Sequence, residues 1–198
     1  MKKRRKFNIS LLGESYVGKT CIINAFDGRM FDHETLRTIG TDTYYTKQEI
    51  NNEEYRFKIY DTAGMEKYRS VSLSTIKFSD GYFIVFSVDD INSYKKIVDY
   101  IDYMEENFDL SEKTFYLIGN KVDVEPKKRA VTKEEAKEFA KSKKAKYFET
   151  SALTGEGIRE SFNEMFQDIY KKYERIYKKK YIYKPLPNHY IINKFLSY

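Results

Sequence analysis

Short apolar runs alternate along the chain with stretches of helical periodicity. Six runs have the length and composition of β-strands: residues 7–12, 43–50, 55–60, 81–88, 114–119 and 146–150. The runs 81–88 and 114–119 are almost continuously apolar, which is typical of central strands covered on both faces. Helical spacing covers residues 19–26, 93–108, 158–170 and the stretch after Thr132.

Local signals support this division. Thr132 followed by Glu135 is a capping box that starts a helix, and Asn51-Asn52 between two strand runs is a hairpin turn signal. Strands that alternate with helices predict an α/β fold, here a six-stranded, mainly parallel sheet with helices on both faces. Ligands bind such sheets beyond the carboxyl ends of the strands.

The segment GESYVGKT, residues 13–20, fits the phosphate-loop pattern G-x-x-x-x-G-K-[ST] between a strand and a helix. Its backbone N–H groups and the helix N-terminus can surround phosphates, and Lys19 can neutralise them while Thr20 binds magnesium. This predicts a P-loop NTPase. The residues expected around the phosphates are Gly13, Ser15, Val17, Gly18, Lys19, Thr20 and Cys21. The alternative for Cys21 is a small buried side chain.

Three further motifs follow predicted strands. Asp61-Thr62-Ala63-Gly64 offers a carboxylate for magnesium and a glycine N–H for the γ-phosphate. In Asn120-Lys121-Val122-Asp123, Asp123 can accept hydrogen bonds from two donors of guanine, a pair that adenine lacks. Asn120 would tie the base loops together and the Lys121 stem would cover the base. In Ser151-Ala152-Leu153, the Ala152 N–H would donate to guanine O6.

The order GESYVGKT, TIG, DTAG, NKVD, ETSA resembles that of the Ras superfamily, and Thr38-Ile39-Gly40 with the stretch from 131 to 166 looks most like its Rab branch. The resemblance implies the small G-protein fold and a GTP/GDP switch in vesicle traffic. It further implies bound Mg²⁺ held by Thr20, Thr38 and Asp61, with Thr38 and Gly64 following the γ-phosphate. Phe31 would lie against guanine, or be a core aromatic.

The resemblance also implies an exchange factor, a GTPase-activating protein and effectors as partners, and we expect a monomer. The expected division is a basic extension at 1–6, a GTPase domain at 7–172 and a basic, Tyr-rich tail at 173–198.

Met65 is the largest departure from the family pattern, which has Gln after Asp-Thr-Ala-Gly. The carboxamide of that Gln orients the attacking water, whereas a thioether cannot donate a hydrogen bond. We therefore expect a GTPase with slow intrinsic hydrolysis, in which Lys19, Thr38, Gly64 and Met65 surround the reacting phosphate. Alternatively, another group or a partner supplies the missing contact.

Other departures concern recognition. Tyr16 replaces a small residue and either covers the ribose or packs on the surface. Of the three aromatics that help Rab proteins recognise effectors, only Tyr60 remains, with Thr43 and Thr75 at the other positions. The tail has no cysteine for prenylation.

Composition narrows the class of protein. The 198 residues, 41% of them hydrophobic, suit one domain with a core. No run approaches the ~20 apolar residues of a membrane span, and no secretion signal follows the basic start. The single cysteine, Cys21, excludes an internal disulfide and a Cys-based zinc cluster. We expect a cytoplasmic protein, peripheral to the cytosolic face of a membrane if attached.

Charge is concentrated at the ends. Residues 2–6 hold five cations, and residues 171–198 hold eight cations and one acid, Glu174. Because the whole chain has a net charge of only +6, the part between these ends is acidic. Such ends can meet an anionic membrane or simply be solvated.

The sequence suggests four possible functions: a regulatory GTPase, a GTP-binding scaffold with little hydrolysis, another phosphate-loop enzyme such as a nucleotide kinase, and a nucleic-acid binder. Asn120 to Asp123 and the lack of a lid insertion oppose the kinase. The acidic body and the lack of a nucleic-acid motif oppose the last.

Overall fold

The computed structural model describes residues 6–32, 38, 40–63 and 77–177. Its strands are β1 (Lys6–Leu12), β2 (Thr41–Ile50), β3 (Glu53–Thr62), β4 (Gly81–Ser87), β5 (Thr114–Asn120) and β6 (Lys146–Thr150). Its helices are α1 (Lys19–Phe26), α3 (Ile91–Asn107), the short η1 (Pro126–Lys128), α4 (Lys133–Ser142) and α5 (Ile158–Tyr177). No helix in the described part of the chain has the length and apolarity to cross a membrane.

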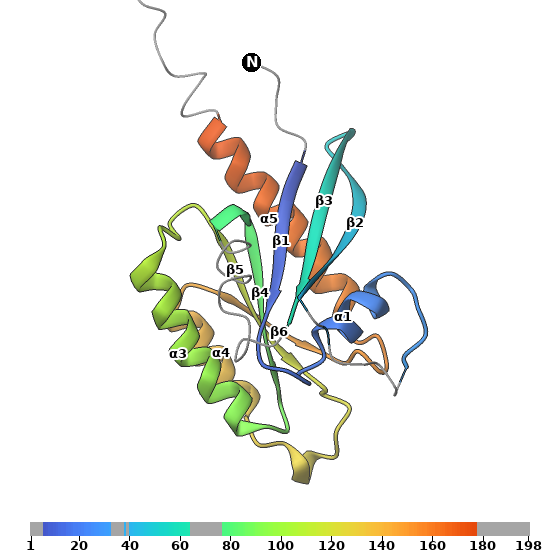
Figure 1. Cartoon of the computed structure of the whole chain (residues 1–198), viewed down its shortest axis with the longest axis vertical. Coiled ribbons are helices and arrows are strands. Elements are labelled where there is room, and N and C mark those ends of the chain that lie inside the picture. The colour runs from blue at the N-terminus through green and yellow to red at the C-terminus, as the bar shows by residue number, and fades with distance from the viewer. Residues whose placement is uncertain (1–5, 33–37, 39, 64–76, 178–198) are drawn as a thin grey trace, which may run out of the picture.

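The six strands form one sheet in the order β2-β3-β1-β4-β5-β6 (Figure 1). Only the β2–β3 pair is antiparallel, and every other pair is parallel. The predicted six-stranded, mainly parallel sheet is confirmed. The turn at Asn51 and Asn52 has positive φ at both residues, which is the backbone that a two-residue hairpin requires.

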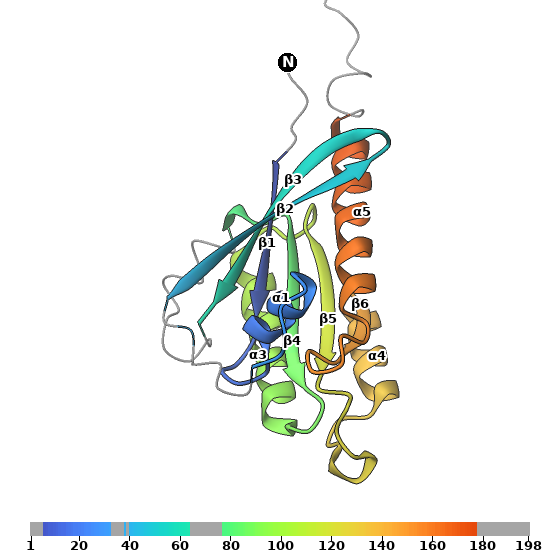
Figure 2. The ribbon, with the colours of Figure 1, turned by 90° about the vertical axis from the view of Figure 1, so that its right-hand side faces the viewer.

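Successive residues of the central strands point to opposite faces, and each face has its own core. Phe83 and Val85 of β4 pack with α1 and α5, whereas Tyr82, Ile84 and Phe86 pack with α3 and α4. Figures 1 and 2 show the two helix layers on either side of the sheet. This double coverage explains why β4 reads as a continuous apolar run.

Strands β2 and β3 and helix α5 are longer than predicted. The β2–β3 ladder extends from Ile50 opposite Glu53 to Thr41 opposite Thr62, because cross-strand pairing continues through residues without strand-like composition. Helix α5 continues past Tyr170 to Tyr177. Its last turns are held by packing, since Tyr173 meets the ring of Phe7 edge-on at 5.4 Å.

All parallel strands run in the same direction, so their carboxyl ends share one edge of the sheet. The described chain enters at β1 and leaves at the end of α5 at the opposite, amino edge (Figure 1). The four motifs therefore meet at the carboxyl edge, where α/β sheets hold their ligands.

Candidate nucleotide and magnesium site

The loop between β1 and α1 has the backbone that the phosphate-loop pattern predicts. Gly13 and Gly18 both have positive φ, 148° and 96°. A Cβ at Gly13 would lie 2.2 Å from the Val85 oxygen, and one at Gly18 would lie 2.4 Å from Asn120 Nδ2. Only glycine fits the loop at these two points. No side-chain hydrogen bond caps the N-terminus of α1, which is the end of a helix that favours an anion.

Lys19 is fixed across the mouth of this loop. Its Nζ donates to the main-chain oxygens of Gly13 at 2.9 Å and Glu14 at 2.8 Å, and the residue is only 6% exposed. The ammonium is thus buried and oriented by the same loop whose amides would hold phosphates. This position suits the charge-neutralising role predicted for Lys19.

The three residues predicted to bind magnesium are in contact. Thr20 Oγ1 donates to Asp61 Oδ2 at 2.6 Å, and Thr38 Oγ1 donates to the same atom at 3.2 Å. The two hydroxyls are 2.9 Å apart. These residues are 18 to 41 positions apart in sequence. They come into contact because α1, β3 and the segment before β2 converge at the carboxyl edge.

Asp61 has a buried carboxylate oxygen that a cation could bind. The residue is fully buried, and its Oδ1 has no hydrogen-bond partner among the described residues. Burial raises the pKa of the Asp61 carboxyl, while the Thr20 hydroxyl and the charge of Lys19 oppose that rise. The described ranges contain no larger cluster of metal-binding side chains. One carboxylate with two hydroxyls fits Mg²⁺, which completes its coordination shell with phosphates and water.

Asn120 links the phosphate loop to the base loops. Its Nδ2 donates to the Val17 oxygen at 2.8 Å. Its Oδ1 accepts from Thr150 Oγ1 at 3.1 Å and from the Ala152 N–H at 3.3 Å. The side chain, 1% exposed, therefore joins three segments through all its polar groups, as predicted.

The remaining base-loop residues lie at the carboxyl ends of β5 and β6. Ser151 Oγ donates to Asp123 Oδ1 at 2.5 Å, which holds one carboxylate oxygen in place. Lys121 has a positive φ of 68°, and its Nζ lies 4.0 Å from Asp89. Leu153 is 49% exposed. These residues come together at the ends of β5 and β6.

Comparison with known proteins identifies this arrangement. A model of the Ras family matches residues 8–171. The chain is 32% identical over 166 residues to Ras-related protein Rab-13 of Mesocricetus auratus. The aligned residues make up 84% of this chain and 81% of that protein. The chain belongs to the Ras family. It is also 31% identical over 169 residues to Ras-related protein Rab-15 of Homo sapiens, covering 85% and 79% of the two chains. Ras-related protein Rab-11C of Dictyostelium discoideum is 33% identical over 164 residues, covering 83% and 72%. The predicted Rab-like small GTPase is thus confirmed at the level of family and fold.

Five other residues singled out in the sequence lie among the described residues. Phe31 and Cys21 are half-buried against the core between the sheet and α5, in line with the packing alternative, and their contact with nucleotide stays a prediction. Tyr16 has a positive φ of 66° and is 77% exposed, and both its contact with the ribose and its packing on the surface stay predictions. Thr43 and Tyr60 face each other across the β2–β3 ladder, where Lys58 lies 4.5 Å from the Tyr60 ring centre. Gly64, Met65 and Thr75 lie outside the described residues.

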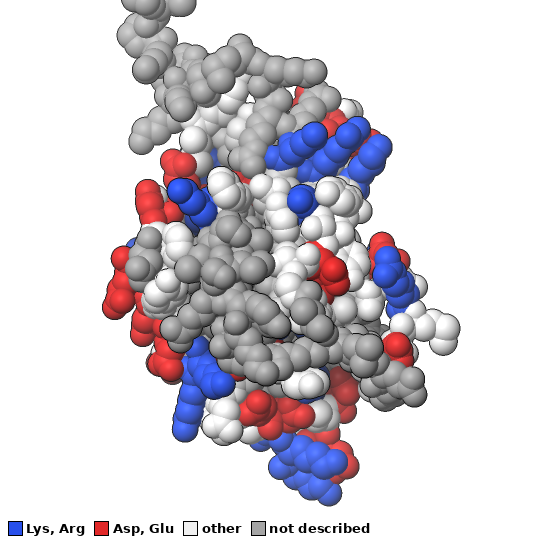
Figure 3. All heavy atoms as spheres, viewed as in Figure 1, with Lys and Arg blue, Asp and Glu red and all other residues white. Residues whose placement is uncertain are grey.

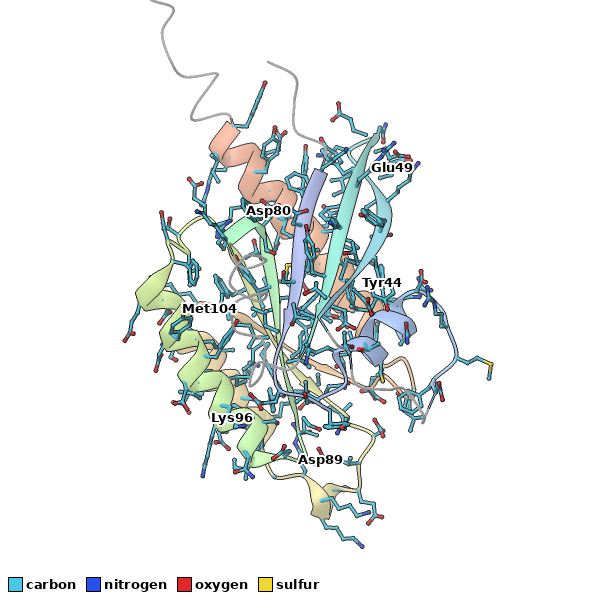
Figure 4. All side chains as sticks on the ribbon, viewed as in Figure 1. Tyr44, Glu49, Asp80, Asp89, Lys96 and Met104 are labelled. Carbon is cyan, nitrogen blue, oxygen red and sulfur yellow. The ribbon has the colours of Figure 1, made fainter. Side chains whose placement is uncertain are left out.

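One contact of the site has no signal in the sequence. Lys96 Nζ of α3, labelled in Figure 4, forms an ion pair with Glu14 Oε2 of the phosphate loop at 2.9 Å. Glu14 occupies a variable position of the motif and lies 82 residues from Lys96. No spacing rule connects them, and only the fold brings them together.

Proposed function

We propose that this chain is a Rab-like GTP/GDP switch that acts in vesicle traffic and hydrolyses GTP slowly. The observation that carries the proposal is the side chain of Asn120, which joins the phosphate loop to both base loops. A nucleotide can then be gripped at its phosphates and its base by one connected structure.

The phosphate end would work by electrostatics. Lys19 would exchange its two loop carbonyls for phosphate oxygens, and the loop N–H groups would stabilise charge that develops as water attacks the γ-phosphate. Thr20, Thr38 and Asp61 would hold Mg²⁺, which supplies charge neutralisation when bound. Because Thr38 belongs to the segment before β2, its contact would order that segment with GTP and release it with GDP.

The base end would select guanine. Asp123, held by Ser151, would accept from the two adjacent guanine donors. In Asp123→Asn, an amide N–H donor replaces one carboxylate oxygen acceptor. The new donor suits xanthine, because xanthine has a carbonyl where guanine has an amino group. We expect Asp123→Asn to lose guanine preference and gain xanthine preference, while Asp99→Asn, an exposed position on α3, leaves it unchanged.

Met65 bears on rate and on the alternative function. Without a carboxamide to orient water, turnover would depend on a GTPase-activating partner, which would also supply an arginine. If turnover is absent, the chain is a GTP-binding scaffold. In either case we propose a monomer that meets an exchange factor and effectors at the cytosolic face of a membrane.

Mass spectrometry of nucleotide released from the purified chain tests the proposal. GDP is the expected result for a working switch. Retained GTP would favour the scaffold. Bound ATP or ADP, or binding that ignores the purine, would overturn the assignment of Asp123 and the proposed function with it.

A further inference from the structure

A cavity opens at the end of the molecule opposite to the candidate nucleotide site. It has a volume of about 770 Å³ and lies between the last turns of α3, α4 and α5 and the first residues of β5 and β6. Figure 4 labels Asp80 at this amino edge and Asp89 at the carboxyl edge, with the α3 residue Met104 nearer the former. The volume is within the range of small-ligand sites.

The cavity has an apolar floor and a basic rim. Ile84, Ile101, Phe115 and Leu117 contribute to the floor, whereas seven Lys or Arg side chains and only two acidic ones line the rest. The surroundings do not share this excess, because acidic side chains follow the outer side of α3 in Figure 3. The outer side of α3 therefore does not share the positive charge of the cavity lining.

Both acidic groups of the lining are already engaged. Asp168 pairs with Lys146 at 2.6 Å and accepts from the Tyr116 hydroxyl at 2.8 Å. Glu105 pairs with Lys143 at 2.8 Å. Burial would raise the pKa of Asp168, but Lys146 and the Tyr116 hydroxyl hold it below its usual range. Asp102 and then Glu105 raise the pKa of Lys143. The acids cannot also neutralise the other cations of the lining.

Four cations of the lining are left over: Lys113, Lys144, Lys172 and Arg175. In the part of the chain that the structure describes, none of them has a carboxylate within ion-pair distance. Lys113 Nζ donates to the Ser79 oxygen at 2.6 Å, and Lys172 Nζ donates to the Lys113 oxygen, so two ammonium groups are fixed by main-chain acceptors. Each has three donors, which leaves donors for a ligand. Burial lowers the pKa of Lys172, and the charge of Arg175 lowers it further.

We propose that this cavity binds an anion with clustered phosphomonoester groups, such as the headgroup of a phosphorylated inositol lipid or its soluble counterpart. Phosphate oxygens accept charge-assisted hydrogen bonds from Lys and Arg, and a dianion satisfies several cations at once. The edge is also where the chain enters at Lys6 and leaves at Tyr177, next to the basic residues 2–5 and 178–180 of the sequence (Figure 1). A lipid source would place this end of the molecule against a membrane.

The test uses the full chain loaded with GDP and Mg²⁺, and compares two double variants. Lys172→Gln with Arg175→Gln removes two cations of the cavity. Lys127→Gln with Lys128→Gln removes two from the exposed η1 at the opposite end, and is the matched control for charge. Titration with inositol 1,4,5-trisphosphate should show a Kd raised about tenfold or more in the cavity variant, and raised less than about twofold in the control.

Equal affinity in the two variants would overturn the proposal. So would equal displacement of the trisphosphate by a Glu-rich peptide of the same charge, since the site would then recognise acidic protein. Arg175→Gln alone, at an exposed position of α5, serves if the double variant fails to fold.

Sedimentation with vesicles of phosphatidylinositol bisphosphate or of phosphatidylserine at equal charge distinguishes a lipid ligand from a soluble one. If the parent prefers the phosphatidylinositol bisphosphate vesicles and the cavity variant does not, the ligand is a lipid. If the parent binds the trisphosphate but shows no such vesicle preference, the ligand is a soluble phosphate. None of these measurements depends on guanine selectivity, so the proposal fails separately from the proposed function.

Discussion

The amide of Asn120 donates to the main-chain oxygen of Val17 at 2.8 Å, across 103 residues of sequence. This hydrogen bond couples the phosphate loop to the strand end that carries Asp123. The second polar atom of the same side chain accepts from the β6 loop. We therefore expect the phosphate loop and the base loops to act together, so that binding of phosphate depends on binding of the base.

Replacing Asn120 by Ala tests this coupling. The change removes up to three hydrogen bonds of about 0.5–1.5 kcal/mol each, so about 2–3 kcal/mol of nucleotide binding should be lost. We expect GDP to dissociate about 30–100-fold faster, measured with a fluorescent GDP analogue. Asn92→Ala, at an exposed position on α3, should leave the rate unchanged. Unaltered dissociation from Asn120→Ala would show that the loops are held independently.

Asp61 should make opposite contributions to stability and to magnesium binding. Burial raises its pKa in the folded chain, so the folded state favours the neutral acid, and stability falls as pH rises from the unfolded value through the raised one. In chain stripped of nucleotide and magnesium, Asp61→Asn should therefore melt at a higher temperature than the parent at neutral pH. The difference should narrow as pH falls toward the ordinary pKa of Asp.

The same variant should lose magnesium-dependent retention of GDP, because the amide lacks the charge that the cation requires. Asp99→Asn, exposed on α3, is the control for charge and should change neither property. A destabilised Asp61→Asn at neutral pH would contradict the burial argument.

The sequence was most informative where one local rule decides the structure. The capping box at Thr132 is present, with Thr132 Oγ1 accepting from the Glu135 N–H at 3.2 Å. The apolar run from residue 81 is a strand buried on both faces. The glycines of the phosphate loop have the positive φ that their motif requires. In each case the residues that carry the signal also make the structure.

Contacts between distant segments could not be predicted in this way. Helix α5 outlasts its predicted end because Tyr173 packs on Phe7, a contact between the two ends of the domain. The basic cavity draws its lining from six helices and strands, and no single segment of the sequence carries its charge pattern. Tertiary proximity creates both features.

The ion pair of Lys96 and Glu14 is another such contact, and it should steady the phosphate loop. Lys96 is more than half exposed, so the pair is worth about 0.2–1 kcal/mol. Lys96→Met should speed GDP dissociation about 2–5-fold, and added salt should reduce the difference between parent and variant. Lys95→Met, the exposed neighbour on α3, is the matched control. A rate insensitive to both the substitution and salt would mean that the pair does not act on the loop.

Met65 decides how the proposed GTPase is regulated. A thioether cannot orient the attacking water, whereas the carboxamide of Gln both donates and accepts, so Met65→Gln should raise single-turnover hydrolysis about tenfold or more. Nucleotide affinity should stay the same, because the change acts on the transition state and not on binding. Met30→Gln makes the same chemical change at a residue that is 93% exposed, and should leave the rate at the parent value. If Met65→Gln hydrolyses no faster than this control, the slow step lies elsewhere in the site, and restoring a single water contact is not enough to restore turnover.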